Sequence, residues 1–325
     1  MLGELISLSV AISWTATALF ADVASRRLGS LGLNVVRMGL SLLLLALTLW
    51  LTLGTPLPPM TNGGTWLWLC LSGFVGYVLG DYCLFQCYVL IGARFGQLLM
   101  TLSAPSAAIT AWLLLGERLS TMAVVAGLVT LTGIAMSILS RKDGVGKLQL
   151  KLPMRGVLLG IGAGMGQGIG LVLSKVGMGC YTESLHDCGI SDPSSWTAPD
   201  ALLPIPVGVM MPFASTMIRA IVGLLGFVVA ITLLNKQARI KLRQGAHDAT
   251  ARWCALGATL FGPFIGVSLS LMATLYTHAG IAQTIMAMTP VFILLPSWLL
   301  FRQRVTWMEV VGAMVSVVGV SLFFL

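Results

Sequence analysis

Long apolar stretches separated by short polar breaks run through almost the whole of this 325-residue chain. A helix that spans a bilayer needs about 20 mostly apolar residues. Ten stretches come close to that length, at roughly 2–21, 33–53, 66–90, 95–115, 120–140, 155–176, 208–234, 252–276, 279–301 and 305–325. Charged residues make up only 9% of the chain, against about 25% in a soluble domain. We therefore predict an all-α polytopic membrane protein embedded in membrane lipids, with no separate soluble domain.

The first of these stretches differs from a cleaved signal peptide. It has no basic leading region, and Glu4 is its only early charge. We expect it to remain in the protein as the first membrane helix.

The net charge of +8 is distributed as a topology signal rather than as a surface for nucleic acid. Basic residues follow the first, third, fifth, seventh and ninth stretches: Arg26, Arg27, Arg94, Arg141, Lys142, Lys147, Lys151, Arg155, Lys236, Arg239, Lys241, Arg243, Arg252, Arg302 and Arg304. The other connections hold only Arg118 and Lys175, and the longest, at about 178–207, is acidic. Because basic connections stay in the cytoplasm, ten helices place both termini outside it.

The two halves of the chain repeat each other. The matched positions are Trp14 with Gln167, Arg37 with Arg219, Gly80 with Gly266, Gln97 with Gln283, Met100 with Met286, and Pro105 with Pro290, the last within one residue. Five helices per repeat is an odd number, so the second copy must enter the membrane upside down. Such inverted repeats place the substrate near the midplane between the copies. We predict two repeats, 1–145 and 146–325, around a central cavity.

The first half contains four short motifs at or next to its apolar stretches: Gly80-Asp81 in the third, the junction Leu90–Arg94 after it, Ser103-Ala104-Pro105 in the fourth, and Leu114–Ser120 before the fifth. In these residues the chain resembles the EamA-type family of the drug/metabolite transporter superfamily. The resemblance covers essentially the whole chain, although Phe301-Arg302-Gln303-Arg304 replaces the Gly-Glu-Arg turn in the second half. It implies a ten-helix basket in the bacterial inner membrane that moves small organic metabolites such as amino acids, often outward. That family is generally described with cytoplasmic termini, whereas the charge pattern argues the reverse.

Arg37 and Asp81 are charged residues inside apolar stretches. A charge at the bilayer centre costs roughly 2.5–3.5 kcal/mol on insertion scales and usually faces a partner or a cavity. Asp81 lies in the helix after Arg37, with Tyr77 one turn earlier on the same face. The two charges are predicted to form an ion pair. Either the pair only locks the bundle, or it belongs to the site and Asp81 binds cargo or carries a coupled proton.

Arg219 repeats Arg37 without repeating its partner. The position that matches Asp81 is Val267, followed by Ser268. A buried cation without a partner is strained, so Arg219 either extends toward the outer surface of the membrane or faces a ligand anion. Extension toward the surface is the favoured alternative, because Arg219 is about two turns from the start of its stretch.

The matched amides Gln97 and Gln283 are each followed by methionine at +3 and proline at +8 or +7. A lone glutamine in a membrane helix usually bonds a neighbouring helix. The prolines release backbone carbonyls, which is tolerated where a helix lines a polar cavity. Gln97, Met100, Gln283 and Met286 are therefore predicted to line the cavity.

Trp14 and Gln167 are the matched residues of the first and sixth stretches, and Gln167 lies in the glycine-rich segment Gly160–Gly170. Trp14 either packs in the bundle or stacks on a planar or cationic ligand. The glycines are predicted to allow close helix packing. They do not form a nucleotide loop, because no strand precedes them and no Lys-Ser/Thr follows.

The cysteines and histidines do not predict a metal site. Cys180 and Cys188, separated by seven residues in the acidic connection, either form a disulfide outside the cytoplasm or remain free thiols. The other four cysteines lie in apolar stretches and are predicted to pack as small residues. The three histidines are scattered, and we expect no metal and no cofactor.

Two kinds of function fit these features. The first is a secondary transporter of small organic solutes, with protons as a candidate coupling ion. The second is a channel, receptor or structural membrane protein without coupled transport. No carboxylate pair, His cluster or Ser/His dyad points to an intramembrane enzyme, and no Walker motif points to an ATP-driven pump. Matched polar residues in inverted repeats favour the transporter, with Trp14, Arg37, Tyr77, Asp81, Gln97, Met100, Gln167, Arg219, Gln283 and Met286 as its candidate site.

Overall fold

The structure, a computed structural model, describes residues 1–139, 153–234, 236–292, 296 and 307–322. The regular elements in these residues are helices, three of them (η) π-helical. Their bounds are α1 (Leu2–Leu28), α2 (Ser30–Leu53), α3 (Gly63–Gly73), η1 (Phe74–Asp81), α4 (Tyr82–Met100), α5 (Ser103–Leu115), α6 (Thr121–Leu139), α7 (Met154–Asp187), α8 (Val207–Val229), η2 (Ala230–Leu234), α9 (Lys236–Gly245), α10 (Ala249–Thr259), η3 (Leu260–Phe264), α11 (Ile265–Tyr276), α12 (Ala279–Met286), α13 (Thr289–Phe292) and α15 (Trp307–Ser321). Six of the described helical runs are long and apolar enough to cross a membrane, and three shorter apolar helices accompany them. The prediction of an all-helical polytopic membrane protein is confirmed.

Most of the predicted stretches coincide with helices or with helices joined through a π-helical segment. The stretch predicted at 279–301 begins as α12 and α13, and the one predicted at 305–325 contains α15. The remainder of both lies outside the described residues. So do six basic residues of the predicted topology signal: Arg141, Lys142, Lys147, Lys151, Arg302 and Arg304.

The break predicted between 90 and 95 does not interrupt the helix, because α4 continues to Met100. The chain nevertheless doubles back inside α4. A Cβ atom on Gly96 would lie 2.6 Å from the ring of Tyr88, whereas eight residues of straight helix separate two positions by about 12 Å. The change of direction predicted between 90 and 95 therefore lies inside α4, and the helix itself is interrupted later, at Thr101 and Leu102 before α5.

The connection predicted to start near 178 starts later, because α7 continues as helix to Asp187. Its polar last turns are held by the loop that follows α2. Tyr181 donates a hydrogen bond to the Pro59 carbonyl and Ser184 donates one to the Met60 carbonyl, each at 2.7 Å. With 34 residues, α7 is about 51 Å long and exceeds the roughly 30 Å of bilayer hydrocarbon.

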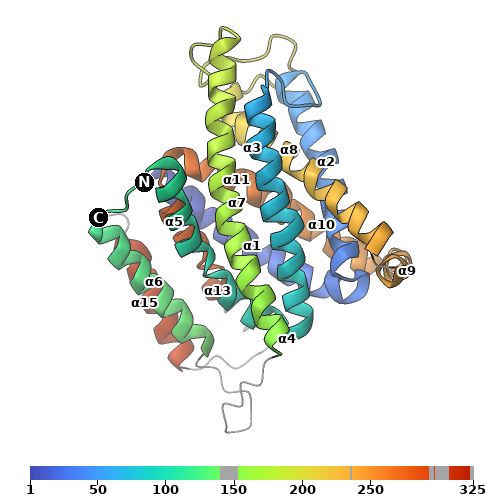
Figure 1. Cartoon of the computed structure of the whole chain (residues 1–325), viewed down its shortest axis with the longest axis vertical. Coiled ribbons are helices and arrows are strands. Elements are labelled where there is room, and N and C mark those ends of the chain that lie inside the picture. The colour runs from blue at the N-terminus through green and yellow to red at the C-terminus, as the bar shows by residue number, and fades with distance from the viewer. Residues whose placement is uncertain (140–152, 235, 293–295, 297–306, 323–325) are drawn as a thin grey trace.

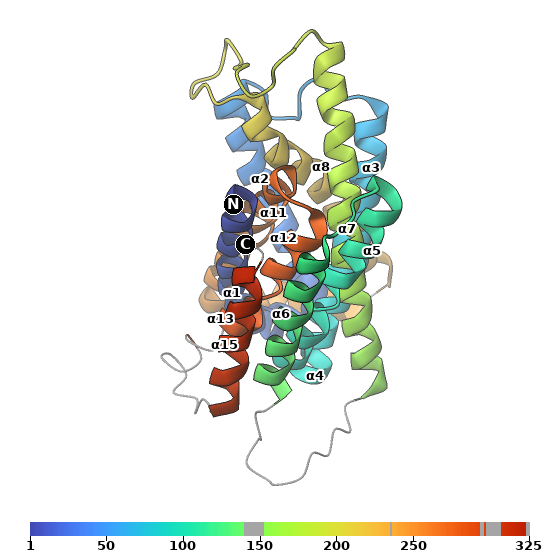
Figure 2. The same cartoon turned by 90° about the vertical axis from the view of Figure 1, so that its left-hand side faces the viewer.

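The helices form an elongated bundle with two chemically different ends (Figures 1 and 2). We call acidic end the side with the α2–α3 and α7–α8 connections, residues 54–62 and 188–206. We call basic end the side with the C-terminus of α1 and the amphipathic helix α9, a basic surface helix that hydropathy did not predict. Helices α6 and α15 lie side by side in both views.

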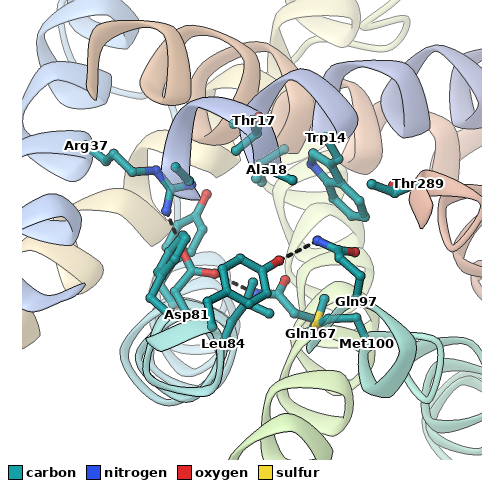
Figure 3. Close-up of a pocket in the computed structure, with 16 residues that line it drawn as sticks. Trp14, Thr17, Ala18, Arg37, Asp81, Leu84, Gln97, Met100, Gln167 and Thr289 are labelled. Carbon is teal, nitrogen blue, oxygen red and sulfur yellow. Dashed lines mark hydrogen bonds and ion pairs between the residues drawn. The ribbon is translucent and has the colours of Figure 1, made fainter. Parts of the chain in front are cut away.

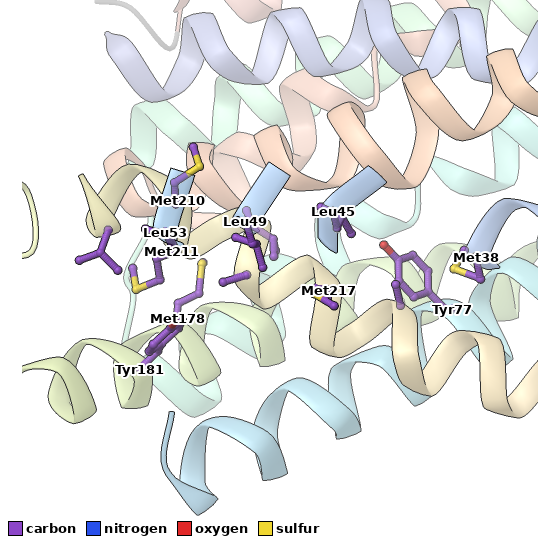
Figure 4. Packing of buried hydrophobic residues seen from close by; sticks show 14 of the residues in the cluster. Met38, Leu45, Leu49, Leu53, Tyr77, Met178, Tyr181, Met210, Met211 and Met217 are labelled. Carbon is purple, nitrogen blue, oxygen red and sulfur yellow. The ribbon is translucent and has the colours of Figure 1, made fainter. Parts of the chain in front are cut away.

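A cluster of large apolar side chains fills the bundle on the acidic side, between α2, α7, α8 and η1 (Figure 4). Its members include Met38, Leu49, Met178, Tyr181 and Met217, all nearly inaccessible to solvent. Helix α7 also packs closely against η1, since a Cβ on Gly170 would lie 2.9 Å from the Cα of Gly76. The prediction of close helix packing at these glycines is confirmed.

Candidate functional site

A cavity lies beside this cluster, on its basic side, and is surrounded by α1, α2, η1, α4, α7, η3, α11 and α13 (Figure 3). It is lined by Trp14, Thr17, Ala18, Ala21, Arg37, Tyr77, Asp81, Leu84, Phe85, Tyr88, Gln97, Met100, Gln167, Gly262, Val267 and Thr289. A smaller cavity shares four of these residues and adds Thr101, Ser103, Gln283, Met286 and Ala287. All the predicted site residues except Arg219 therefore line these two cavities.

The centre of the larger cavity is a buried polar group formed by Arg37, Asp81 and Gln167. An Arg37 guanidinium nitrogen lies 3.5 Å from one Asp81 carboxylate oxygen, so the predicted ion pair is present. The Gln167 amide donates a 2.7 Å hydrogen bond to the other carboxylate oxygen and a 3.1 Å bond to the Gly76 carbonyl. Arg37 and Asp81 are only 4% and 5% exposed, so their charges are compensated by each other rather than by water.

Arg37 also contacts groups outside the ion pair. It donates a 3.2 Å hydrogen bond to Asn34, one turn earlier on α2, and its guanidinium lies over the Phe85 ring at 4.8 Å. Its terminal nitrogen packs against η3, where a Cβ on Gly262 would approach it to 2.8 Å. These contacts fix the guanidinium between α2, α4 and η3.

Arg219 occupies a matching environment in the other half of the chain. Its guanidinium lies over the Tyr77 ring at 4.8 Å, and a Cβ on Gly76 would approach its terminal nitrogen to 2.9 Å. The expectation that Arg219 extends to the membrane surface is wrong, because α8 holds it inside the bundle at 3% exposure. No carboxylate lies within salt-bridge distance of it in the described part of the chain.

The surroundings of Arg219 do not balance its charge. A cation–π contact is worth up to about 2 kcal/mol when desolvated, while a buried cation in a membrane helix costs roughly 2.5–3.5 kcal/mol. Asp81 attracts Arg219 from a distance, but its ion pair is with Arg37. Arg37 and Arg219 are positive and Asp81 is negative, so these three buried side chains together carry a net formal charge of +1.

The two matched glutamines lie at matched breaks in the helices. Gln97 donates a hydrogen bond to the Tyr88 hydroxyl, and Gln283 donates one of 2.8 Å to Ser103. Each glutamine is followed by a methionine at +3 and a two-residue interruption, Thr101-Leu102 or Ala287-Met288. Non-helical backbone at membrane depth is tolerated where it faces protein or a cavity, and residues from both interruptions line the smaller cavity.

Trp14 and Gln167 pack against matched glycines. A Cβ on Gly266 would lie 2.8 Å from the Trp14 indole, and one on Gly80 would lie 3.4 Å from the Gln167 amide. Each of these residues therefore reaches a helix of the other half of the chain at the same relative position. The Trp14 side chain points toward Gln97 and Thr289 in the cavity (Figure 3).

Sequence reasoning missed Asn34, Phe85, Tyr88 and Thr289. Phe85 and Tyr88 lie four and seven residues after Asp81, the spacing of one helix face, which was the only available signal for them. Asn34 lies one turn before Arg37. Thr289 follows the interruption at Ala287-Met288, as Ser103 follows the one at Thr101-Leu102 in the first half. Neither aromatics nor hydroxyls in apolar stretches stand out as site residues by type alone.

A second charged cluster, also not predicted, closes the acidic side near the chain start. Lys175 of α7 lies 2.6 Å from Glu117, which follows α5, and donates a 3.1 Å hydrogen bond to the Thr277 carbonyl. The other Glu117 oxygen accepts a 3.0 Å bond from the Ala279 backbone at the start of α12 and faces His278 at 3.4 Å. We call Lys175, Glu117, Thr277, His278 and Ala279 the charged latch.

The described residues contain no cluster of His, Cys, Asp or Glu that could hold a metal ion. Cys180 and Cys188 are free thiols, the first within α7 and the second at its C-cap. Eight residues of helix separate them by about 12 Å, farther than a disulfide spans. Of the two alternatives for this pair, the structure has the free thiols.

Three comparisons place the chain among known proteins. The model of the EamA-like transporter family matches residues 1–139 and 195–325. No curated protein matches the chain. Chains of solved structures do match, among them a crystal structure with 15% sequence identity and a TM-score of 0.64, which covers 99% of this chain and 95% of its own. At that identity the likeness concerns the fold alone.

Proposed function

Because the chain belongs to the EamA-like transporter family and is a transporter rather than an enzyme, we propose that it carries small organic metabolites across the membrane by alternating access. Amino-acid-like solutes are the proposed cargo, and export is the proposed direction. The observation that carries the proposal is the cavity at Arg37, Asp81 and Gln167, a polar site inside an apolar bundle. Intramembrane charges of this kind mark substrate or ion pathways.

Reciprocal contacts support two inverted five-helix repeats, 1–145 and 146–325, as the basis of this cycle. Arg37 reaches Gly262 in η3, while its match Arg219 reaches Gly76 in η1. Trp14 and Gln167 reach Gly266 and Gly80 in the same exchanged manner. Both halves also interrupt a helix for two residues directly after a matched methionine. A twofold axis in the membrane plane generates such exchanged pairs. The family match falls in two ranges, one in each half.

The unequal ends of the bundle support alternating access. From Tyr77 toward the acidic end, the interior is filled by the apolar cluster. From Tyr77 toward the basic end, the cavity continues along Leu84 and Tyr88. We take this conformer as the state in which the acidic end is closed. Exchanging the conformations of the two repeats would close the basic end instead.

The chemistry of the cavity suits a zwitterion with an apolar body. Trp14, Tyr77 and Tyr88 supply aromatic surface, and Gln97, Gln167 and Asp81 supply hydrogen-bonding groups. Asp81 is proposed as the coupling or cargo-binding carboxylate, because its repeat counterpart Val267 is apolar. An architectural ion pair would be expected in both copies.

The proposed topology has both termini outside the cytoplasm, in the bacterial inner membrane. A reporter that is active only in the cytoplasm, fused after Leu325, should stay silent, whereas the same reporter placed after Arg243 should be active. A strong signal from the C-terminal fusion would reverse the topology.

The transport proposal is tested by flux in proteoliposomes. Purified protein is reconstituted, and labelled amino acids, nucleobases and organic cations are followed with and without a pH gradient, against protein-free vesicles. We expect protein-dependent flux of an amino-acid-like solute that is accelerated by unlabelled solute on the opposite side, a behaviour that a channel lacks. Absence of protein-dependent flux for the whole panel would exclude the proposal for these solute classes.

The matched glutamines provide the site control for this assay. Gln97→Ala and Gln283→Ala each remove an amide at a helix interruption and should reduce flux about tenfold or more, while the yield of folded protein stays close to that of the wild type. Arg239→Gln, on the exposed face of α9, is the matched surface control and should retain wild-type flux. Full activity in both glutamine variants would remove them from the site.

A further inference from the structure

Arg219 is a buried cation whose neighbours leave its charge uncompensated. Its Nε has no hydrogen-bond partner among the described residues, and its guanidinium lies over the face of Tyr77 and close to the backbone of η1. The Nε of Arg37, the matched residue, is unpartnered as well, and Arg37 likewise has one aromatic and one glycine neighbour. In addition, Arg37 has the Asn34 side chain and the carboxylate of Asp81. The difference between the two sites is thus a missing anion beside Arg219.

The two arginines also lie on opposite sides of Tyr77. Arg37 lines the cavity, on the basic side of this ring. Arg219 lies on the acidic side, where its backbone packs on Gly73 and where Met217, two residues before it, is part of the apolar cluster. When the acidic end opens, the cluster separates and the face of Arg219 that is now covered becomes cavity wall.

Resting on the proposed function, we infer that Arg219 is the residue that binds the anionic group of the cargo, a carboxylate, in the state open to the acidic end. In that state Arg219 lines the open cavity, as Arg37 lines the cavity in the state described here. Val267 replaces the acidic residue at the matched position, and no carboxylate of the described residues lies within salt-bridge distance of Arg219 to compete with the cargo. The affinity for a carboxylate is therefore higher when the acidic end is open than when it is closed, since Arg37 remains paired with Asp81.

Three probes that differ only in their charged groups separate this inference from general apolar binding: phenylalanine, 3-phenylpropionate and phenethylamine. The apparent Kd of each is measured from the ligand dependence of the melting temperature of the purified full-length protein. The two carboxylate probes should bind wild type more tightly than phenethylamine does. Equal or tighter binding of phenethylamine would overturn the inference.

Removing the guanidinium tests the residue itself. Arg219→Gln should weaken binding of both carboxylate probes by about ten- to a hundredfold, the effect of losing a hydrogen bond to a charged group, and should leave phenethylamine within about twofold. Arg239→Gln on α9 is the matched control and should change none of the three values. Unchanged Kd values for the carboxylates in folded Arg219→Gln would overturn the inference.

Val267→Asp tests the same inference without removing Arg219. By the repeat correspondence, the new carboxylate would stand to Arg219 as Asp81 stands to Arg37. Val267→Asp should therefore weaken the two carboxylate probes relative to phenethylamine by a similar factor. Val267→Asn introduces a side chain of the same shape as aspartate but without its charge. This variant should keep the wild-type order of the Kd values of the three probes. If Val267→Asp retains that order, Arg219 does not bind the anion, whether or not Arg219→Gln folds.

Flux in proteoliposomes distinguishes failure here from failure of the transport proposal. If the wild type moves members of the panel but Arg219 has no effect on carboxylate binding, the transport proposal stands and this inference falls. If no panel member moves, the transport proposal falls first.

Discussion

The two ends of the bundle are held together by different kinds of contact. At the acidic end, large side chains such as Met178, Tyr181 and Met217 interdigitate, and the charged latch joins α7 to the turns after α5 and α11. At the basic end, α1 meets α10 through alanines, and Arg27 pairs with Asp248 through side chains that are 46% and 31% exposed. An exposed ion pair and small apolar contacts contribute less than a buried cluster does. The comparison indicates that the acidic end is held more firmly than the basic end in this conformer.

The largest loss of stability is expected from replacing Asp81, which lies between the two ends. Asp81→Asn leaves Arg37 buried without a partner and should lower the free energy of unfolding by about 3–5 kcal/mol. Adding Arg37→Gln should restore stability. If Asp81 serves transport, the double variant folds and shows no flux, as judged by size-exclusion profiles and the proteoliposome assay. A folded double variant with full flux would assign the pair to architecture alone.

A smaller effect is expected from overpacking the closed end. In Gly73→Ala the new Cβ would lie 2.7 Å from the Arg219 carbonyl and 2.9 Å from its Cα, a contact with backbone that cannot rotate away. We expect a loss of about 1–3 kcal/mol, measured by thermal or denaturant unfolding in detergent. Gly39→Ala is the control, because no atom lies within 4 Å of its added Cβ. Equal stabilities of the two variants would contradict the tight packing of this end.

Weakening the charged latch should shift the population of states rather than unfold the protein. Glu117 and Lys175 are 11% and 22% exposed in their side chains, so their pair is screened only in part. Glu117→Gln should favour the state open to the acidic end by about fivefold and lower the apparent Kd of 3-phenylpropionate by a similar factor at most. Faster hydrogen exchange in residues 176–187 should accompany the change. An unchanged Kd and unchanged exchange would remove the latch from the closure of this end.

The smallest effect is expected at the basic end, from Arg27 and Asp248. The hydrogen bond from Arg27 lowers the pKa of Asp248 below its ordinary value of 3.8. A lowered carboxyl pKa stabilises the fold at pH above the ordinary value and loses that contribution as the pH falls through the lowered one. Asp248→Asn should therefore reduce the melting temperature slightly at pH 7, and the difference from the wild type should shrink as the pH falls below the ordinary carboxyl pKa and through the lowered one. A larger decrease in melting temperature at pH 7 for Asp248→Asn than for Glu117→Gln would contradict the conclusion that the acidic end is held more firmly.

Hydropathy and repeat matching predicted most of the helices and many of the residues that line the cavities, because both signals depend on residues whose environment is fixed by the membrane. An arginine or glutamine in an apolar stretch has few alternatives to a cavity or a partner, so Arg37, Gln97 and Gln283 were correctly assigned to the cavities. The burial of the Arg219 side chain was not predictable, since it depends on whether this part of α8 lies against Tyr77 or against lipid.

The missed features depend on tertiary contacts. The last turns of α7 contain Glu183, His186 and Asp187, which indicate a loop by composition, and they are helical because Tyr181 and Ser184 bond the loop after α2. Lys175 and Glu117 were assigned to connections because each lies at the edge of an apolar stretch. Their pairing requires α5 and α7 to be neighbours, which no local pattern in either segment reports.

The glycines of α7 bear on the order in which the bundle assembles. Nine of its 34 residues are glycine, so this helix offers little side-chain surface of its own, and its attraction to neighbours comes from backbone contact with η1, α4 and α5. Those partners are all encoded earlier in the chain. During synthesis α7 therefore enters the membrane after the surfaces that receive it exist. A variant that delays the first half should leave α7 unpacked and open to quality-control proteases, even when every residue of α7 is unchanged.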